Sequence, residues 1–240
     1  MARAALADTA GRMKRFYKAA TVGPGRAILL DGRPVKTPGR VDLAPPSAAL
    51  ADAIAAEWEA QDETINPRSM PLTGLANAAI DRIAPDKDAF ARGLTAYGES
   101  DLICYRPERP APLVARQAGH WDPILAWARR RYDVDFTVAE GVIHAQQPAH
   151  TIDQLAQAVL ARDAFQLAGL SPLVTVSGSL LIGLAFADEA IDLDTAWAAA
   201  TVDEAWQAEQ WGEDAEAAKA LANRRADFAA GHRFLTLLAA

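Results

Sequence analysis

The spacing of apolar residues changes near Pro85, and this change limits the possible folds more than any other feature of the chain. Before residue 45, short β-prone runs alternate with turns, whereas after Pro85 the segments repeat their apolar residues at helical intervals. Strands followed by a series of helices are typical of an α+β architecture. We predict a small α+β domain at residues 1–84 and a larger all-helical domain of about six or seven helices at residues 85–240.

A hairpin signal supports the predicted sheet. Asp31-Gly32 lies between two β-prone runs. A two-residue type I′ turn requires positive φ at both central positions, and Asp followed by Gly is favoured there. We therefore expect a small antiparallel sheet near residues 15–43.

A helix is expected to cover this sheet. Ser47 follows two prolines and is a suitable N-cap, and Leu50, Ile54 and Trp58 then recur at helical spacing. This stripe predicts one buried helical face. The predicted fold class is thus α+β, with a small N-terminal antiparallel sheet, a covering helix and a larger helical domain.

Residues 170–187 form the longest uncharged run in the chain. Its length approaches that of a membrane span, but it contains one proline, two glycines and three serines. A buried core helix is therefore the better interpretation. We expect Gly169 to end the preceding helix and Ser171-Pro172 to begin this one as N-cap and first helical residue.

The charge and the cysteine content narrow the class of protein. A net charge of -7 and a pI near 5.1 disfavour general binding to nucleic acid or to an anionic membrane, while leaving room for a local basic patch. Cys104 is the single cysteine, so a reducing compartment is expected, either the bacterial cytoplasm or the mitochondrial matrix of a eukaryote. We interpret the N-terminus as a frayed tail rather than a transit peptide, because it contains Asp8.

The sequence contains no recognisable active-site motif. Gly23 and Gly25 lead into a strand without the pattern of a phosphate loop, and neither Ser177 nor Ser179 has the flanking glycines of a nucleophile elbow. Cys104 lies among apolar residues and is interpreted as a small buried hydrophobe. The histidines lack partners at metal-binding spacing: His120, His144, His150 and His232. The residues by themselves therefore predict no cofactor and no metal ion.

Two tryptophans and six carboxylates occur together in one stretch, DEAWQAEQWGEDAEA, at residues 203–217. On a single helix over residues 195–211, Trp206 and Trp211 fall on opposite sides, and both sides are partly apolar. Such a helix is sandwiched, either wholly within its own protein or between its own core and a partner. Core burial is the simpler interpretation for either tryptophan alone. Tryptophans interleaved with acids also fit a protein-binding surface.

Three stretches in a fixed order carry a family resemblance: AAEWEAQDETINPRSMPLTGLANAAIDRI at residues 55–83, YGESDLICYR at residues 97–106, and the stretch at residues 203–217. FYKAATV and PVKTP precede them in the expected order. Together they resemble the ATP12-type family of assembly chaperones for the α subunit of the F-type ATP synthase. The resemblance spans most of the chain, from Arg15 to Glu216.

The resemblance implies a molecular chaperone without catalytic activity. Members of this family are ATP-independent holdases that bind the unassembled α subunit and shield the surface that later meets the β subunit. An unassembled subunit exposes a large apolar interface that would otherwise aggregate. The implied partner is thus the α subunit of the F-type ATP synthase, with no role for nucleic acid, nucleotide or membrane insertion.

The resemblance also implies which residues contact the client. Glu204 is the first candidate and Glu209 the second, each as an acceptor for an Arg side chain or a backbone N–H. Asp203 stands where relatives carry glutamate, which keeps the charge but shortens the reach. Trp206 or Trp211 would fill an apolar pocket of the client. The complete set of candidates is Glu204, Trp206, Gln207, Glu209, Trp211, Trp58 and Gln61, of which Trp58 fits core packing equally well.

Two other functions remain as alternatives. A hydrolase with Glu204 and Glu209 as an acid and base pair would need both carboxylates to face one substrate, but on one helix they lie about 140° apart. A helical adaptor for a different client would keep the same surface and change only the partner.

Overall fold

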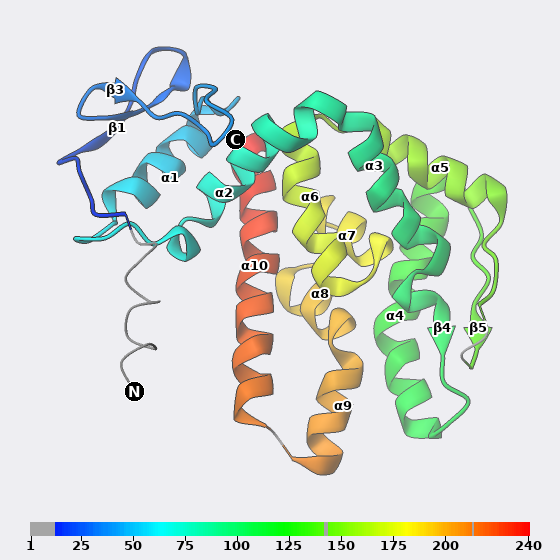
Figure 1. Cartoon of the computed structure of the whole chain (residues 1–240). Helices are drawn as coiled ribbons and strands as arrows, with labels where there is room; N and C mark the ends of the chain where they lie inside the picture. The colour runs from blue at the N-terminus through cyan, green and yellow to red at the C-terminus, as the bar shows by residue number, and fades with distance from the viewer. Residues whose placement is uncertain (1–12, 142–143, 213) are drawn as a thin grey trace, which may run out of the picture.

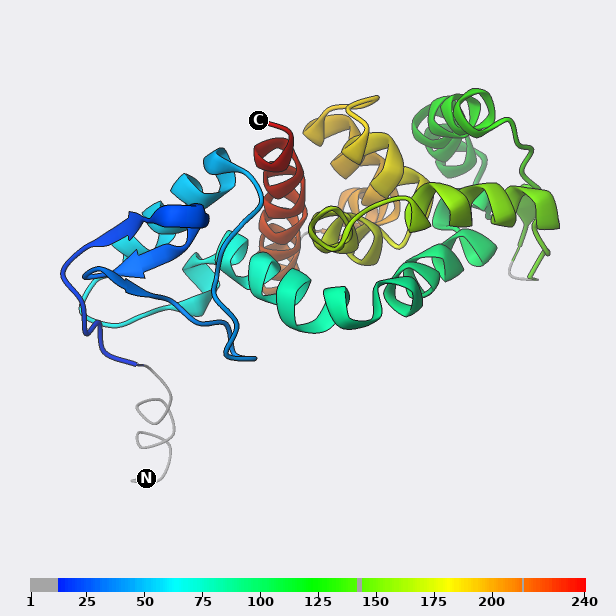
Figure 2. The ribbon, with the colours of Figure 1, turned by 90° about the horizontal axis from the view of Figure 1, so that it is seen from above.

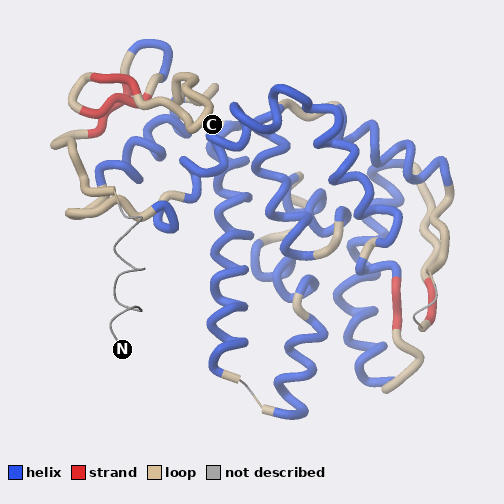
Figure 3. The backbone as a smooth tube through the Cα atoms, in the orientation of Figure 1, coloured by secondary structure: helices blue, strands red, loops and turns tan. Residues whose placement is uncertain are grey.

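The computed structural model describes residues 13–141, 144–212 and 214–240. Residues 1–12 of the predicted N-terminal tail, which spans residues 1–18, therefore lie outside the described residues, as does Glu213. Residues 13–18 are not a frayed tail, because Tyr17 is buried and donates its hydroxyl proton to the Trp58 carbonyl at 2.6 Å. A small sheet and its helix lie at one end of the molecule, and helices form the rest (Figure 1). Within the described residues, the strands lie in two short regions, as the tube coloured by secondary structure shows (Figure 3). The predicted α+β fold class is confirmed.

The N-terminal sheet consists of three antiparallel strands in the order β1 (Ala20–Val22), β2 (Ile28–Leu30) and β3 (Arg33–Pro34). The turn between β2 and β3 lies at Asp31-Gly32, where φ is 48° and 79° respectively. Positive φ at both positions is the requirement of a type I′ turn. The hairpin prediction is therefore confirmed.

One helix, α1 (Ala48–Glu59), packs against the sheet. Leu50 donates its backbone N–H to Ser47 Oγ at 3.2 Å, so Ser47 is the predicted N-cap. Leu50 and Ile54 are fully buried, whereas Trp58 is only partly buried near the C-terminal end of the helix. The predicted stripe thus covers the sheet.

A bent helical segment leads from the sheet to the other helices and curves along one side of the molecule (Figure 2). It consists of α2 (Pro71–Ala78), the π turn η3 (Ala79–Ile83), the short η4 (Ala84–Asp86) and α3 (Lys87–Thr95). The hydrophobic core is continuous across this segment, because Ile28 of the sheet belongs to the same buried cluster as Phe228 near the C-terminus. The division into two domains at residue 84 stays a prediction.

A two-stranded parallel pair lies far from the first sheet, formed by β4 (Tyr105–Arg106) and β5 (Ala139–Glu140). The long helix α4 (Ala111–Tyr132) connects these strands and continues through Pro123. The short 3₁₀ helix η6 (Leu102–Cys104) precedes β4. Asp101 is its N-cap, because the Asp101 carboxylate accepts the N–H of Ile103 at 3.2 Å.

Three helices follow: α5 (Ala149–Leu160), α6 (Ala164–Ser177) and α7 (Leu180–Ala187). The predicted boundary at Gly169 and Ser171-Pro172 is wrong, because α6 passes through all three residues. Helix α6 ends instead before Gly178, which is its C-cap and has a left-handed conformation with a φ of 70°.

Helix packing explains the misplaced boundary. Gly169 faces α10, and a Cβ atom there would lie 3.2 Å from the carbonyl oxygen of Gly231 and 2.7 Å from the Leu235 side chain. The glycine therefore permits the close approach of two helices and does not act as a C-cap. Sequence alone does not distinguish these two uses of glycine.

The C-terminal part contains α8 (Leu193–Ala200), α9 (Val202–Trp211) and α10 (Ala215–Ala239). A continuous helix over residues 195–211 is not formed, because Thr201 has φ −125° and ψ 21°. Its side chain is buried and donates to the Trp197 carbonyl at 2.7 Å. After residue 86 the structure thus describes eight α-helices rather than six or seven.

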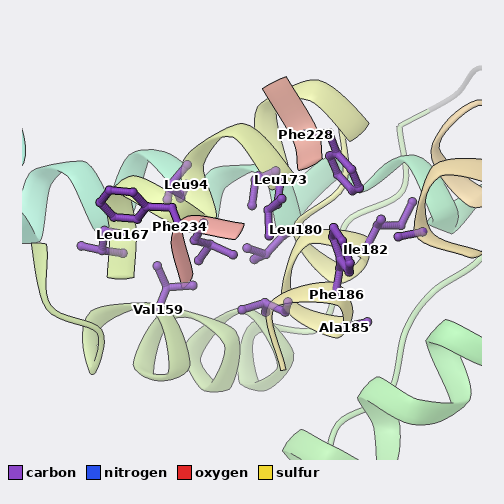
Figure 4. Packing of buried hydrophobic residues seen from close by; sticks show 14 of the residues in the cluster. Leu94, Val159, Leu167, Leu173, Leu180, Ile182, Ala185, Phe186, Phe228 and Phe234 are labelled. Atoms are coloured by element: carbon purple, nitrogen blue, oxygen red, sulfur yellow. The ribbon is translucent and has the colours of Figure 1, made fainter. Parts of the chain in front are cut away.

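The centre of the molecule is filled by buried apolar side chains from five helices, α3, α5, α6, α7 and α10 (Figure 4). Phe186 of α7 stacks on Phe228 of α10 with ring centroids 5.1 Å apart. The uncharged run at residues 170–187 lies in this core as parts of α6 and α7. None of the helices in the described ranges is long and apolar enough to cross a bilayer.

Candidate functional site

Helix α9 and the beginning of α10 form the lower end of the molecule in the view of Figure 1, away from the sheet. Val202 is the only buried residue of α9. Trp211, at the C-terminal end of α9, is 78% exposed, the highest value among the exposed large hydrophobic residues described. The interpretation of this tryptophan as a core residue is therefore wrong. We call this end, residues 202–212 and 214–224, the α9–α10 arm.

The two candidate glutamates face different neighbours. Glu204 accepts from Arg224 of α10 at 3.0 Å, and Arg224 also donates to the Val176 carbonyl at 3.0 Å. Glu209 accepts two hydrogen bonds from Arg116 of α4, at 2.7 and 2.8 Å. This bidentate pair lowers the pKa of Glu209 and raises that of Arg116. The different partners agree with the wide angle between the two glutamates on the helix. Glu204 and Glu209 therefore do not form an acid and base pair.

Trp206 contributes to the contact between α9 and α4. The Arg116 guanidinium lies 5.1 Å from the centre of the Trp206 ring, so Arg116 both stacks on the indole and binds Glu209. Asp203 accepts from Gln117 Nε2 at 2.7 Å in the same contact. Trp206, Glu209 and Asp203 thus hold α9 against α4. Their partners on α4 could not be found from the local sequence pattern.

A shallow groove of about 470 Å³ lies between α9 and α10. Glu204, Gln207 and Trp211 line its α9 side, and small alanines with Leu221 line much of its α10 side. The groove is open to solvent and mostly apolar, and its polar groups are the carboxylates of Glu204 and Asp214, the amide of Gln207 and the guanidinium of Arg224. Such a surface suits an apolar protein segment that also carries hydrogen-bond donors.

The other two predicted contact residues are Trp58, on α1, and Gln61, just after α1, and both lie at the end of the molecule that carries the sheet (Figure 1). Gln61 is only 4% exposed and uses its whole amide internally. It donates to the Glu57 carbonyl and to Ser69 Oγ, and accepts from the Asn66 N–H, at distances between 2.7 and 3.1 Å. Gln61 therefore has an internal structural role. Trp58 lines a separate groove beside the sheet.

The other stretches that carry the resemblance form internal caps. Glu57 accepts the backbone N–H groups of Leu72 and Thr73 at 2.8 Å each, which links the EW stretch to the first turn of α2. Asp101 is fully buried and accepts the N–H of Leu181 at 3.0 Å, which links its stretch to α7. Burial raises the pKa of Asp101 to about 6. These acids stabilise the fold, and sequence analysis did not identify them.

Cys104 and the histidines are the remaining residues considered for catalysis or metal binding. Cys104 is buried, and burial together with the nearby Asp101 charge raises the pKa of its thiol to about 12. The thiol is therefore protonated and unreactive at neutral pH, in agreement with its interpretation as a buried hydrophobe. Among the described residues, no group of three or more His, Cys, Asp or Glu side chains is placed to hold a metal ion.

Two crystal structures of bacterial proteins match this architecture over nearly the whole chain. Atp12 from Paracoccus denitrificans is 42% identical, with a TM-score of 0.88, and the match covers 94% of this chain and 98% of that one. A candidate chaperone from Agrobacterium tumefaciens is also 42% identical, with a TM-score of 0.91, and the match covers 95% of this chain and 87% of that one.

The fold and its 42% identity to Atp12 therefore place this protein among the chaperones. Residues 14–129 match the family described as ATP12 chaperone protein. The chain belongs to the ATP12 chaperone family, which confirms the resemblance found in the sequence. The family match ends within α4 and so covers the sheet, α1, α2 and α3 but not the α9–α10 arm.

Proposed function

We propose that this protein binds the unassembled α subunit of the F-type ATP synthase and prevents its aggregation before it meets the β subunit. Membership of the ATP12 chaperone family supports a chaperone role in ATP synthase assembly and argues for a function without catalysis. The α subunit as the specific client is the partner that the sequence resemblance implies. The bacterial origin of both matched structures supports the cytoplasm as the place of action.

The observation that carries the proposal is the exposure of Trp211 beside the groove of the α9–α10 arm. A tryptophan that is 78% exposed leaves a large apolar surface in water, which is unfavourable unless a partner covers it. Tryptophan is also enriched among the residues that dominate binding energy. We infer that Trp211, Gln207 and Glu204 contact the client directly.

Trp206 and Glu209 act differently in this proposal. Both are engaged by Arg116, so they position α9 for binding and provide less free surface. Glu204 keeps one carboxylate oxygen beyond its bond to Arg224 and lines the groove. That free oxygen can accept an N–H from the client.

Co-expression with the α subunit, in the absence of the β subunit, tests the proposed function. We expect soluble α subunit and a co-purifying complex with this protein, and insoluble α subunit without it. Removing a buried hot-spot side chain costs at least about 2 kcal/mol, so Trp211→Ala should weaken the complex about 30-fold. Val41→Ala removes another hydrophobic side chain, 51% exposed, and provides the control.

Two results would contradict the proposal. If the α subunit is insoluble with and without this protein, the client assignment is wrong. If Trp211→Ala and Val41→Ala bind the α subunit as well as the unmodified chain does, the α9–α10 arm is not the binding surface. Unchanged far-UV circular dichroism of both variants would show that neither substitution acts through unfolding.

A further inference from the structure

Helix α9 has few apolar contacts with the rest of the protein. Val202 is its only buried residue, whereas residues 207–211 are exposed and Trp206 is half-buried. The neighbouring helices are anchored differently, since α8 buries three alanines and α10 buries Phe228 and Phe234. Packing of an apolar face supplies most of the stability of a helix in a protein, and segments with few buried apolar contacts open at low free energy. Polar contacts must therefore contribute to the position of α9.

The first turn of α9 has two such contacts. Asp203 accepts from Gln117 of α4 at 2.7 Å, and Glu204 accepts from Arg224 of α10 at 3.0 Å. Both acids lie at the beginning of the helix. They therefore fix its first turn and do not reach the remainder, residues 205–211.

One residue of α4, Arg116, contacts the remainder of the helix. Its guanidinium donates to both carboxylate oxygens of Glu209, at 2.7 and 2.8 Å, and lies 5.1 Å from the centre of the Trp206 ring. Glu209 and Trp206 are three positions apart and so share one face of α9. Within the described part of the chain, no other side chain forms a hydrogen bond or ion pair between residues 205–211 and another element. The polar attachment of this part of α9 thus depends on a single side chain.

This attachment is accessible to solvent. The side chains of Arg116 and Glu209 are 33% and 53% exposed. At exposed positions, ion pairs and cation–π contacts contribute little stability, and salt screens the ion pairs. An attachment of this kind sets the preferred position of α9 and still breaks in the folded protein.

Both ends of α9 are non-helical, which allows the helix to move as a unit. Thr201, between α8 and α9, has φ −125° and ψ 21°. Gly212, at the other end, has φ 90° and ψ 160°, a conformation that is open essentially only to glycine. Hinges consist of a few residues at the ends of elements, where the backbone dihedral angles change. Figure 1 shows α9 as a separate helix between α8 and α10.

We propose that the contacts of Arg116 form a latch that holds α9 on α4, and that Arg116 is thereby a positioning residue of the client-binding surface. With the latch closed, Trp211, Gln207 and Glu204 line one groove with α10. With the latch open, α9 moves about its two ends while α8 and α10 remain folded, and the groove loses one side. The affinity for the client then depends on the fraction of molecules with a closed latch. The proposal rests on the client-binding function proposed above and adds the residue that regulates it.

Amide hydrogen exchange of the full chain without a client, followed by NMR, tests the latch. Arg116→Glu places a negative charge against Glu209 and removes the contact with Trp206. We expect the amides of residues 206–212 to exchange at least about tenfold faster, with exchange in α8 and in the buried part of α10 unchanged. The double variant Arg116→Glu with Glu209→Arg restores the pair of opposite charges. Its exchange should return to within about threefold of the unmodified chain.

Arg225→Glu is the matched control. Arg225 of α10 pairs with Asp194 of α8, and both side chains are exposed. This substitution makes the same change of net charge as Arg116→Glu and also breaks an exposed ion pair, but that pair does not involve α9. Exchange in α9 should therefore be unchanged.

Affinity for the α subunit, measured by biolayer interferometry on the immobilised chain, tests the positioning role. The latch sets only the closed fraction, so Arg116→Glu should weaken binding by up to about tenfold. The double variant should recover the affinity, and Arg225→Glu should bind as the unmodified chain does. Recovery in the double variant separates positioning from a direct contact of Arg116 with the client.

Three results would overturn the proposal. Unchanged exchange of α9 in Arg116→Glu would show that there is no latch. Equal acceleration in α8, α9 and α10 would show a general loss of stability. Faster exchange of α9 with unchanged affinity for the α subunit would remove the positioning role. Failure of the unmodified chain to bind any α subunit would instead contradict the client assignment, and the exchange experiment, which contains no client, then decides on the latch alone.

Discussion

The contact between α6 and α10 holds the long helix that carries one side of the α9–α10 arm, and a single methyl group should disrupt it. At Gly231 of α10, a Cβ atom would lie 2.6 Å from Pro172 Cγ, 2.7 Å from the Gly169 carbonyl oxygen and 3.1 Å from Leu173 Cδ2. The first two atoms belong to a proline ring and to helix backbone, so neither can rotate away. Gly231→Ala should therefore force the two helices apart.

The expected loss of stability follows from two opposing effects. Overpacking of a close-packed core costs up to about 3 kcal/mol. Replacing a glycine inside a helix by alanine recovers about 1 kcal/mol. The net loss for Gly231→Ala is therefore about 2 kcal/mol in the free energy of unfolding, which for a chain of 240 residues lowers Tm by about 4–8 °C.

Gly119→Ala is the matched control. Gly119 also lies inside a helix, α4, but a Cβ atom there would meet no other atom within 4 Å. Only the gain in helix propensity applies, so this variant should be about 1 kcal/mol more stable, with Tm raised by about 2–4 °C. Thermal unfolding followed by circular dichroism measures both. A Tm of Gly231→Ala at or above that of the unmodified chain would refute the close-packing argument.

Two further predictions concern buried groups. The pKa of Asp101 is raised to about 6, above its value in the unfolded chain, so its contribution to stability is complete below about pH 4 and is lost as the pH rises through 6. Asp101→Asn should reduce the slope of stability against pH between pH 4 and 6, measured by urea unfolding, and an unchanged slope would contradict this. Cys104, with its pKa raised to about 12, should react with a thiol reagent at pH 8 only when urea unfolds the chain. Rapid labelling of the native protein would show that the thiol is accessible.

The structure separates the roles of the stretches that carry the family resemblance. Glu57 and Asp101 are engaged in capping helices within the protein, whereas Trp211 stands in solvent. A substitution in the first two stretches is therefore expected to act through stability, and one at Trp211 through binding. Measuring both properties for each variant keeps these effects apart.

Local signals in the sequence determined much of the fold. The Asp31-Gly32 turn and the Ser47 cap were correctly predicted, because each depends on the conformation and hydrogen bonding of residues within a few positions. The α+β class was predicted for the same reason, since hydrophobic periodicity reports on the secondary structure of each segment. The separated motifs in a fixed order also identified the chaperone family.

Tertiary contacts determined the helix boundaries that the sequence misplaced and the surroundings of the candidate residues. Gly169 looked like the end of a helix, but contact with α10 gives it a place inside α6. Arg116 binds Glu209 across 93 positions of the chain, and no periodic pattern connects residues so far apart. The exposure of Trp211 and the burial of Gln61 likewise depend on which helices pack together. Sequence therefore specified the elements and the family, whereas packing between distant segments determined which of the candidate residues a partner can reach.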